Sequence, residues 1–170
     1  IEYILLFKNE AHKEFVTNQN NVKKIIITGK NKLIFNQLQL PLKLATIKAD
    51  YYFFPAFPAP FFFFNRNTIS AIHDVGCWDC PSKNKRYMTF YFKLMYRKAA
   101  LGNKKVVTVS QFSKDRISKI LKKDLDEIAV IYDGLSDCFA NFCYNIEQDI
   151  KAKEAYRLPE KYILCLSTLE

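Results

Sequence analysis

Short apolar runs that alternate with segments of helical period constrain the fold of this chain more than any other feature. Six runs of the β type are predicted as strands at residues 1–7, 24–28, 51–54, 68–73, 106–109 and 128–132. Helix-period segments lie between them at 33–48, 82–101 and 113–122. Strands alternating with helices are typical of a parallel sheet. We therefore predict an α/β fold: a Rossmann-like, mostly parallel sheet with helices on both faces.

Length sets the expected domain organisation, because 170 residues suit one ordinary domain and are too few for two complete ones. The first residue, Ile1, already lies in a strand-like run, and another such run occupies 162–166. A terminal buried strand needs neighbours on both sides, so we expect one lobe that is truncated at both ends. The predicted divisions are a domain at 1–144, a linker helix and connector at 145–160, and the first strand of a further domain at 161–170.

Positive charge is segregated along the chain. The formal net charge is +9, but residues 83–123 carry thirteen Lys and Arg against Asp115 alone, and the rest of the chain carries −3. A concentrated basic region selects polyanions, such as phosphate groups, nucleic acid or an anionic membrane surface. A solvated helix face in a lysine-rich protein is the alternative interpretation.

The helix predicted at 82–101 carries two neighbouring stripes. Four residues at spacings of four, three and seven form an apolar stripe that is expected to dock: Tyr87, Tyr91, Leu94 and Leu101. A second stripe is basic and forms the predicted membrane or anion patch: Arg86, Lys93 and Arg97. The sequence therefore predicts a helix that packs on one side and presents cations on the other.

Five cysteines are an odd number, which argues against a disulfide framework and favours a reducing, cytoplasmic location. Cys77 and Cys80 have the spacing of a redox or zinc pair, but His73 and Asp74 are the only nearby candidate ligands, so no metal is predicted. The apolar run at 51–64 is broken by prolines and is too short for a membrane span. It is interpreted as an extended strand and loop, either filling the core or contacting an acceptor or a membrane.

Candidate site residues follow the predicted strands. His73 and Asp74 come directly after the run at 69–72, at the end of a strand where open α/β sheets bind ligands. An imidazole there can exchange hydrogen bonds with a hydroxyl or a phosphate, although a histidine that caps a loop is the alternative. Ser110 and Ser113 suit the first turn of the next helix, beside Lys114, as caps or as part of an anion site. Glycine-rich nucleotide loops and a Gly-x-Ser-x-Gly elbow are absent from the sequence.

Four sequence blocks combine these residues. They read Ile-Ser-Ala-Ile-His-Asp-Val at 69–75, Val-Val-Thr-Val-Ser-Gln-Phe-Ser-Lys at 106–114, Ile-Ala-Val-Ile-Tyr-Asp-Gly at 128–134 and Leu-Pro-Glu-Lys-Tyr-Ile-Leu-Cys-Leu-Ser-Thr-Leu-Glu at 158–170. In order and spacing they resemble the glycosyltransferase family 4 enzymes of the GT-B fold. The resemblance implies two Rossmann-like lobes facing a cleft, with this chain as the amino-terminal, acceptor-side lobe.

The resemblance also implies an activity and its site. A hexosyl group would pass from a nucleotide-diphosphate sugar to a saccharide or lipid-linked acceptor with retention, as in polysaccharide biosynthesis, and the chain alone would be inactive. His73 would be the catalytic residue, near the donor sugar. Substrate contacts would come from six further residues: Asp74, Ser110, Ser113, Lys114, Asp133 and Gly134. Family members often have Asn-Gly where this sequence has Asp133 and Gly134. The resemblance implies no cofactor beyond the donor sugar.

Partners and alternatives complete these expectations. We expect a nucleotide sugar and an acceptor as partners, with peripheral attachment to the inner face of an anionic membrane through the basic patch. From a different class, the chain could be a basic nucleic-acid-binding α/β module that uses its aromatics as stacking platforms. No recognised RNA or DNA motif supports that reading, so no nucleic acid is expected. A non-catalytic sugar-binding lobe is the third possibility.

Overall fold

The computed structural model describes residues 1–11, 19–83, 85–135 and 145–163. The chain divides into two compact units, Ile1–Tyr132 and Asp133–Glu170, and each is described by itself. The predicted domain boundary at residue 144 lies outside the described residues, as does most of the strand predicted at 161–170.

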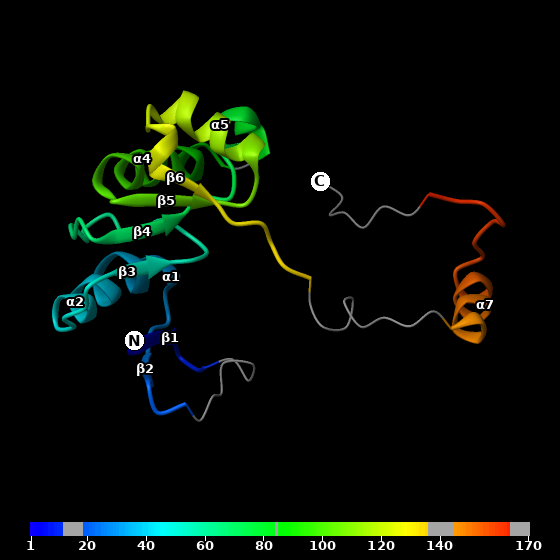
Figure 1. The fold of residues 1–170 in the computed structure, drawn as a ribbon, viewed down its shortest axis with the longest axis horizontal. Coiled ribbons are helices and arrows are strands. Elements are labelled where there is room, and N and C mark those ends of the chain that lie inside the picture. The colour runs from blue at the N-terminus through cyan, green and yellow to red at the C-terminus, as the bar shows by residue number, and fades with distance from the viewer. Residues whose placement is uncertain (12–18, 84, 136–144, 164–170) are drawn as a thin grey trace. The chain divides into compact units, whose positions relative to one another are not determined.

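Four parallel strands form the main sheet of the first unit. In spatial order they are β3 (Tyr52–Phe54), β4 (Thr68–Ala71), β5 (Lys105–Thr108) and β6 (Ile128–Val130). Parallel neighbours need crossover connections. Helix α4 (Arg86–Gly102) lies in the connection from β4 to β5 and α5 (Gln111–Leu121) in that from β5 to β6, while residues 55–67 join β3 to β4. Figure 1 shows both helices beside β5 and β6. The predicted α/β fold, with parallel strands flanked by helices, is confirmed.

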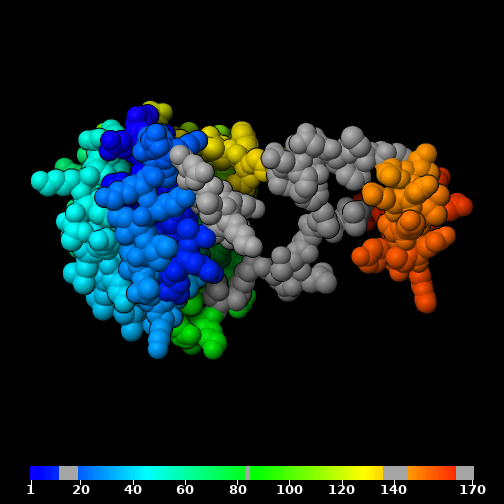
Figure 2. All heavy atoms as spheres, turned by 90° about the horizontal axis from the view of Figure 1, so that it is seen from below, coloured from blue at the N-terminus to red at the C-terminus, as the bar shows by residue number. Residues whose placement is uncertain are grey.

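A second, smaller sheet pairs β1 (Tyr3–Lys8) with β2 (Val22–Ile27) in parallel. The sequence predicts both strands but places them in one sheet with the others, whereas the structure contains two separate sheets. In Figure 2 this pair, in blue, lies at the surface of the first unit, and Tyr3 and Ile26 are about half exposed. Asn9 follows β1, and its side-chain oxygen accepts a hydrogen bond from the Gly29 backbone N–H at 2.8 Å.

The helix predicted at 33–48 is interrupted by a π turn. Its three pieces are α1 (Lys32–Ile34), the π turn η2 (Phe35–Gln39) and α2 (Leu40–Ala45). The Leu40 backbone N–H donates to the Phe35 carbonyl, one residue further back than in an α-helix. Pro41 explains the wider turn, because it has no N–H and its ring would clash with the carbonyl four residues earlier. The turn contains Gln37, which lines the cavity described below.

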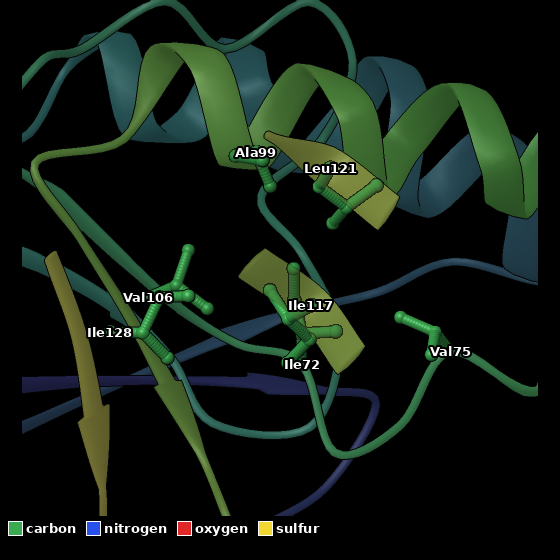
Figure 3. Close-up of a cluster of buried hydrophobic side chains, with 8 residues drawn as sticks. Ile72, Val75, Ala99, Val106, Ile117, Leu121 and Ile128 are labelled. Atoms are coloured by element: carbon green, nitrogen blue, oxygen red, sulfur yellow. The ribbon is translucent and has the colours of Figure 1, made fainter. Parts of the chain in front are cut away.

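The main core fills the space between the sheet and helices α4 and α5 (Figure 3). Its eight buried residues are Ile72, Val75, Ala99, Ala100, Val106, Ile117, Leu121 and Ile128. Val106 and Ile128 are paired across β5 and β6, and Ile117 is fully buried on α5. Each isoleucine side chain that is fully buried contributes about 1.5–3 kcal/mol. This core fixes the strands whose ends carry the candidate site.

Helix α4 packs with a different face from the predicted one. Three of the four residues of the predicted docking stripe, Tyr87, Leu94 and Leu101, are 67%, 42% and 81% exposed. Most of the stripe therefore faces outward, while Tyr91 is part-buried and bonded to Gln37. The buried residues are instead Thr89, Met95, Ala99 and Ala100. Apolar residues surround most of this helix, so their spacing alone does not select a face. The small side chains at 99 and 100 allow the closest approach to the sheet, which favours burial of their face.

The second unit contains one described helix, α7 (Ile146–Ala155). Asn145 caps it by accepting hydrogen bonds from the backbone N–H groups of Glu147 and Gln148. The helix predicted within the linker at 145–160 is thus present. Across the described parts of both units, no helix combines the length and the apolar character that crossing a membrane requires.

Candidate functional site

The site begins where neighbouring parallel strands end. His73 follows β4 and Ser110 follows β5, and these two strands are paired in register. The Ile72 backbone N–H donates to the Val107 carbonyl at 2.8 Å, and the Thr108 hydroxyl donates to the His73 carbonyl at 3.4 Å. The backbone at His73 is therefore fixed to β5, at the edge of the sheet where parallel strands collect ligand-binding loops.

The His73 ring is exposed and is held by one hydrogen bond. Its Nε2 lies 3.1 Å from the Pro55 carbonyl oxygen. A carbonyl can only accept, so Nε2 carries the hydrogen, and in the neutral ring Nδ1 is the acceptor. The imidazole is thus oriented by the aromatic-proline segment at 54–64 while it keeps a nitrogen able to take a proton.

Asp74 shapes the loop that follows the histidine. Its Oδ1 accepts from the Gly76 backbone N–H at 2.7 Å, where α3 (Gly76–Asp79) begins. A Cβ at position 76 would lie 3.0 Å from that oxygen, so a side chain there would disturb the turn. One carboxylate oxygen of this predicted substrate-binding residue therefore orders the loop beside His73.

The first turn of α5 holds three predicted substrate-binding residues. Ser110 is the N-cap: its Oγ accepts from the Ser113 backbone N–H at 3.1 Å and lies 3.1 Å from the Ser113 hydroxyl. Ser113 is only 7% exposed. The buried Ser113 hydroxyl has a structural role beside the cap, and its substrate contact stays a prediction. Ser110 and Lys114 keep partly exposed side chains at this helix start.

Asp133 and Gly134, the remaining predicted substrate contacts, begin the second compact unit and are both exposed. The first unit ends just before them, where the Ile131 backbone N–H donates to the Thr108 carbonyl at 2.8 Å. The site assembled here therefore consists of residues of the first unit, and the role of the Asp-Gly pair remains a prediction.

Trp78 organises two of the three predicted patch cations. Its ring stacks on Tyr96 with 6.1 Å between centroids. The Lys93 Nζ and the Arg97 guanidinium lie 5.6 and 5.9 Å from the Trp78 ring centroid, within cation–π range. Arg86 is exposed at the first residue of α4. The sequence interpretation concentrated on the flanking cysteines and missed the tryptophan between them.

The cysteine pair does not behave as a reactive pair. Cys77 is buried, and burial raises the pKa of its thiol to about 11, whereas Cys80 is exposed. A protonated thiol is neither a nucleophile nor a metal ligand. Asp79 instead forms an ion pair with Arg116, which ties α3 to α5. Among the described residues, no group of three or more His, Cys, Asp or Glu is placed to hold a metal ion.

A cavity of about 360 Å³ lies beside this edge, and sequence reasoning missed it. Three segments form its walls: 32–40 with the π turn, 54–60 from the aromatic-proline segment, and 88–95 on α4. His73 does not line the cavity, but Pro55, which accepts the histidine's hydrogen bond, does. The sequence signal of the π turn in this wall was Pro41, which lies inside the helix predicted at 33–48.

Gln37 joins two cavity walls. Its Nε2 donates to the Tyr91 hydroxyl at 2.6 Å, and its Oε1 accepts from the Phe61 backbone N–H at 2.8 Å. Burial is the main reason that the pKa of Tyr91 is raised, so this phenol keeps its proton. Both ends of the amide are thus used to hold the π turn, α4 and the aromatic-proline segment together.

Lys98 and Ser70 also bond the backbone of the aromatic-proline segment. The Lys98 Nζ donates to the carbonyls of Pro60, at 2.8 Å, and Phe63, and burial lowers its pKa to about 8. The fully buried Ser70 hydroxyl accepts from the Ala59 backbone N–H at 3.1 Å and is bonded to Asn103 at 2.6 Å.

No protein-family model, curated protein or solved structure compared with the chain matches it.

Proposed function

We propose that this chain is the acceptor-side lobe of a glycosyltransferase. The enzyme moves a hexosyl group from a nucleotide-diphosphate sugar to an acceptor hydroxyl with retention of configuration. The observation that carries the proposal is the exposed His73 ring, fixed through Nε2 at the carboxyl edge of a parallel sheet beside the start of α5. The sequence blocks around His73 and Ser110, which resemble family 4, support the same assignment.

His73 is the proposed catalytic residue because its ring nitrogens are distinguished by their surroundings. Nε2 is occupied by the Pro55 carbonyl, so Nδ1 is the atom offered to a sugar hydroxyl or to the departing phosphate. Protonation of Nδ1 converts it from an acceptor into a donor. The ring thus orients the transferred sugar in one state and donates a hydrogen bond to negative charge in the other.

The departing nucleoside diphosphate develops negative charge that fixed donors can stabilise. On this chain the Lys114 side chain, beside the Ser110 cap at the start of α5, is the donor that the proposal assigns to this charge. The family resemblance assigns the main diphosphate cations to the opposite lobe, so the residues of this chain have a supporting electrostatic role. No step of the proposal requires a metal ion.

Peripheral membrane attachment is part of the proposal, because α4 exposes apolar and basic side chains together. Tyr87 and Phe90 are 67% and 70% exposed, and Arg86 and Arg97 lie on the same helix. Helices that combine aromatic and leucine side chains with cations bind in the interface of anionic membranes. A lipid-linked acceptor would then be presented to the lobe at that surface.

The central experiment compares His73→Ala with His73→Gln in the complete enzyme. Both variants should lose transfer, because each lacks the imidazole. The Gln variant can still donate to the Pro55 carbonyl, so it separates loop anchoring from chemistry. Melting temperatures should match wild type, because substitutions at exposed sites change stability by only about 0.5 kcal/mol. Turnover at the wild-type rate in either variant would refute the role of His73.

A further inference from the structure

The cavity between the π turn, the aromatic-proline segment and α4 is a concave feature that the proposed chemistry does not use. We propose that it binds the aliphatic chain of an amphiphile with an anionic head group. This inference rests on the proposed function in one respect: it identifies the acceptor as lipid-linked.

The size of the cavity suits a chain. A volume of about 360 Å³ falls at the lower end of pockets that hold small molecules, about 300–1,000 Å³. At about 30 Å³ for each group the size of a water molecule, it accommodates about twelve such groups. A methylene group is of similar size, so a medium-length alkyl or isoprenoid segment fills the space.

The lining is chemically suited to hydrocarbon. Both methionines of the chain, Met88 and Met95, face the cavity, and aromatic rings and prolines supply most of the remaining wall. Methionine adapts its shape to irregular apolar ligands. A saccharide would instead lose hydration at every hydroxyl, at a cost of about 2–7 kcal/mol for each one left without a partner. An apolar occupant avoids that cost.

Few polar groups in the wall are available to a ligand. Gln37 uses both ends of its amide on Tyr91 and Phe61. The Tyr91 hydroxyl accepts from Gln37 and keeps one hydrogen to donate. Two further polar side chains of the wall, Lys32 and Asn36, both lie on the segment 32–40, so the site offers few groups to a polyhydroxyl ligand.

Charge indicates the nature of the head group. Among the described residues that line the cavity, Lys32 is the one charged side chain. Its Nζ lies 5.5 Å from the centroid of the Phe57 ring, which is half exposed. An ammonium group held there favours an anionic head, such as a phosphate ester, over a cationic one.

The mouth of the cavity lies near the side chains of α4 that are proposed to contact a membrane, and its wall includes the hydrogen-bond partner of His73. Leu33 and Met88 are 57% and 39% exposed at the rim. Met88 lies next to Tyr87 and near Arg86 on α4, where membrane contact is proposed. Pro55, on the cavity wall, is also the hydrogen-bond partner of His73. A chain in the cavity would therefore contact the residue that orients the proposed catalytic ring.

Calorimetric titration with dodecyl phosphate, below its micellar concentration, tests the inference without any turnover assay. We expect one molecule bound per chain and at least tenfold weaker binding of dodecyltrimethylammonium. Met88→Trp, which narrows the mouth from an exposed position, should weaken dodecyl phosphate binding at least tenfold. Leu101→Trp is the matched control on the same helix, because residue 101 is 81% exposed and does not line the cavity. It should bind as wild type does.

Two further variants make the result decisive. Ala56→Trp fills the cavity from the opposite wall, and its loss of binding would support the site even if Met88→Trp failed to fold. Lys32→Gln should weaken dodecyl phosphate but not dodecanol, whereas Lys30→Gln, two residues away and exposed, should change neither. The proposal would be overturned if dodecyl phosphate showed no saturable binding to the wild type, or if Met88→Trp and Ala56→Trp both bound it as tightly as the wild type does.

These outcomes are separable from the proposed function. His73→Ala should bind dodecyl phosphate as wild type does, because the ring does not line the cavity. If dodecyl phosphate binds in the cavity but the complete protein transfers no sugar, the transferase assignment fails and the lipid site stands. If sugar transfer requires His73 but dodecyl phosphate does not bind in the cavity, the transferase assignment stands and the lipid site fails.

Discussion

Replacing Ser70 with alanine tests whether the aromatic-proline segment is held by one buried hydroxyl. Ser70 lies on β4 and is fully buried. Its Oγ accepts from the Ala59 backbone N–H at 3.1 Å and from the Asn103 amide at 2.6 Å. Ala59 is fully buried and Asn103 is only 6% exposed, so water cannot readily replace the lost oxygen.

The magnitude follows from two donors that lose their acceptor. A buried donor left without a partner costs about 1–3 kcal/mol. Removal of the hydroxyl relieves its own desolvation, and local rearrangement recovers part of one bond. We therefore expect Ser70→Ala to lower the free energy of unfolding by about 2–4 kcal/mol. The denaturation slope should stay constant, because the surface exposed on unfolding is unchanged.

Urea unfolding followed by tryptophan fluorescence measures this change. The chain contains a single tryptophan, Trp78, which packs against the main core of the first unit. Ser118→Ala on α5 is the control, because alanine favours a helix and should shift stability by no more than about 0.5 kcal/mol. A double-mutant cycle of Ser70→Ala with Asn103→Ala should give a coupling of about 0.5–3 kcal/mol. Stability of Ser70→Ala within 0.5 kcal/mol of wild type would refute the reasoning.

Two further predictions concern charge. The folded pKa of Lys98, about 8, lies below its usual 10.5, so the unfolded state binds more protons between these values and wild-type stability should rise with pH there. Urea unfolding from pH 7.5 to 10.5 should show the stability difference between wild type and Lys98→Met growing in favour of wild type, and a constant difference would contradict this. Removing the charges of Arg86 and Arg97 together, each worth about 1 kcal/mol at an anionic surface, should weaken binding to phosphatidylserine-containing vesicles about 30-fold. Flotation should show this loss with glutamine replacements, while Lys43→Gln with Lys48→Gln changes binding much less; an equal loss in both pairs would contradict the surface assignment.

The strands and their order along the chain follow from sequence, because each apolar run has an unambiguous length and flanks. The predicted strands at 68–73 and 106–109 match β4 and β5 to within two residues. The position of His73 at the end of β4 follows from the same run. Parallel pairing then brings the ends of neighbouring strands together without further information.

Features that depend on packing do not follow from sequence. Apolar residues surround α4, so its buried face was decided by the small side chains of Ala99 and Ala100 rather than by period. The burial of Ser113 depends on how α5 approaches the sheet. The cavity requires three segments that are far apart in the chain, 32–40, 54–60 and 88–95, and no local pattern encodes their meeting.

The aromatic-proline segment connects these observations, because its backbone is held by side chains from elsewhere rather than by a sheet. Three prolines, at 55, 58 and 60, lack an N–H, so the segment cannot form a regular ladder. Side chains bond its backbone instead, from the π turn, β4, the loop after β4 and α4: Gln37, Ser70, His73 and Lys98. Occupation of the cavity and orientation of the His73 ring therefore share one segment, so an acceptor chain bound there would contact the residue that positions the proposed catalytic group.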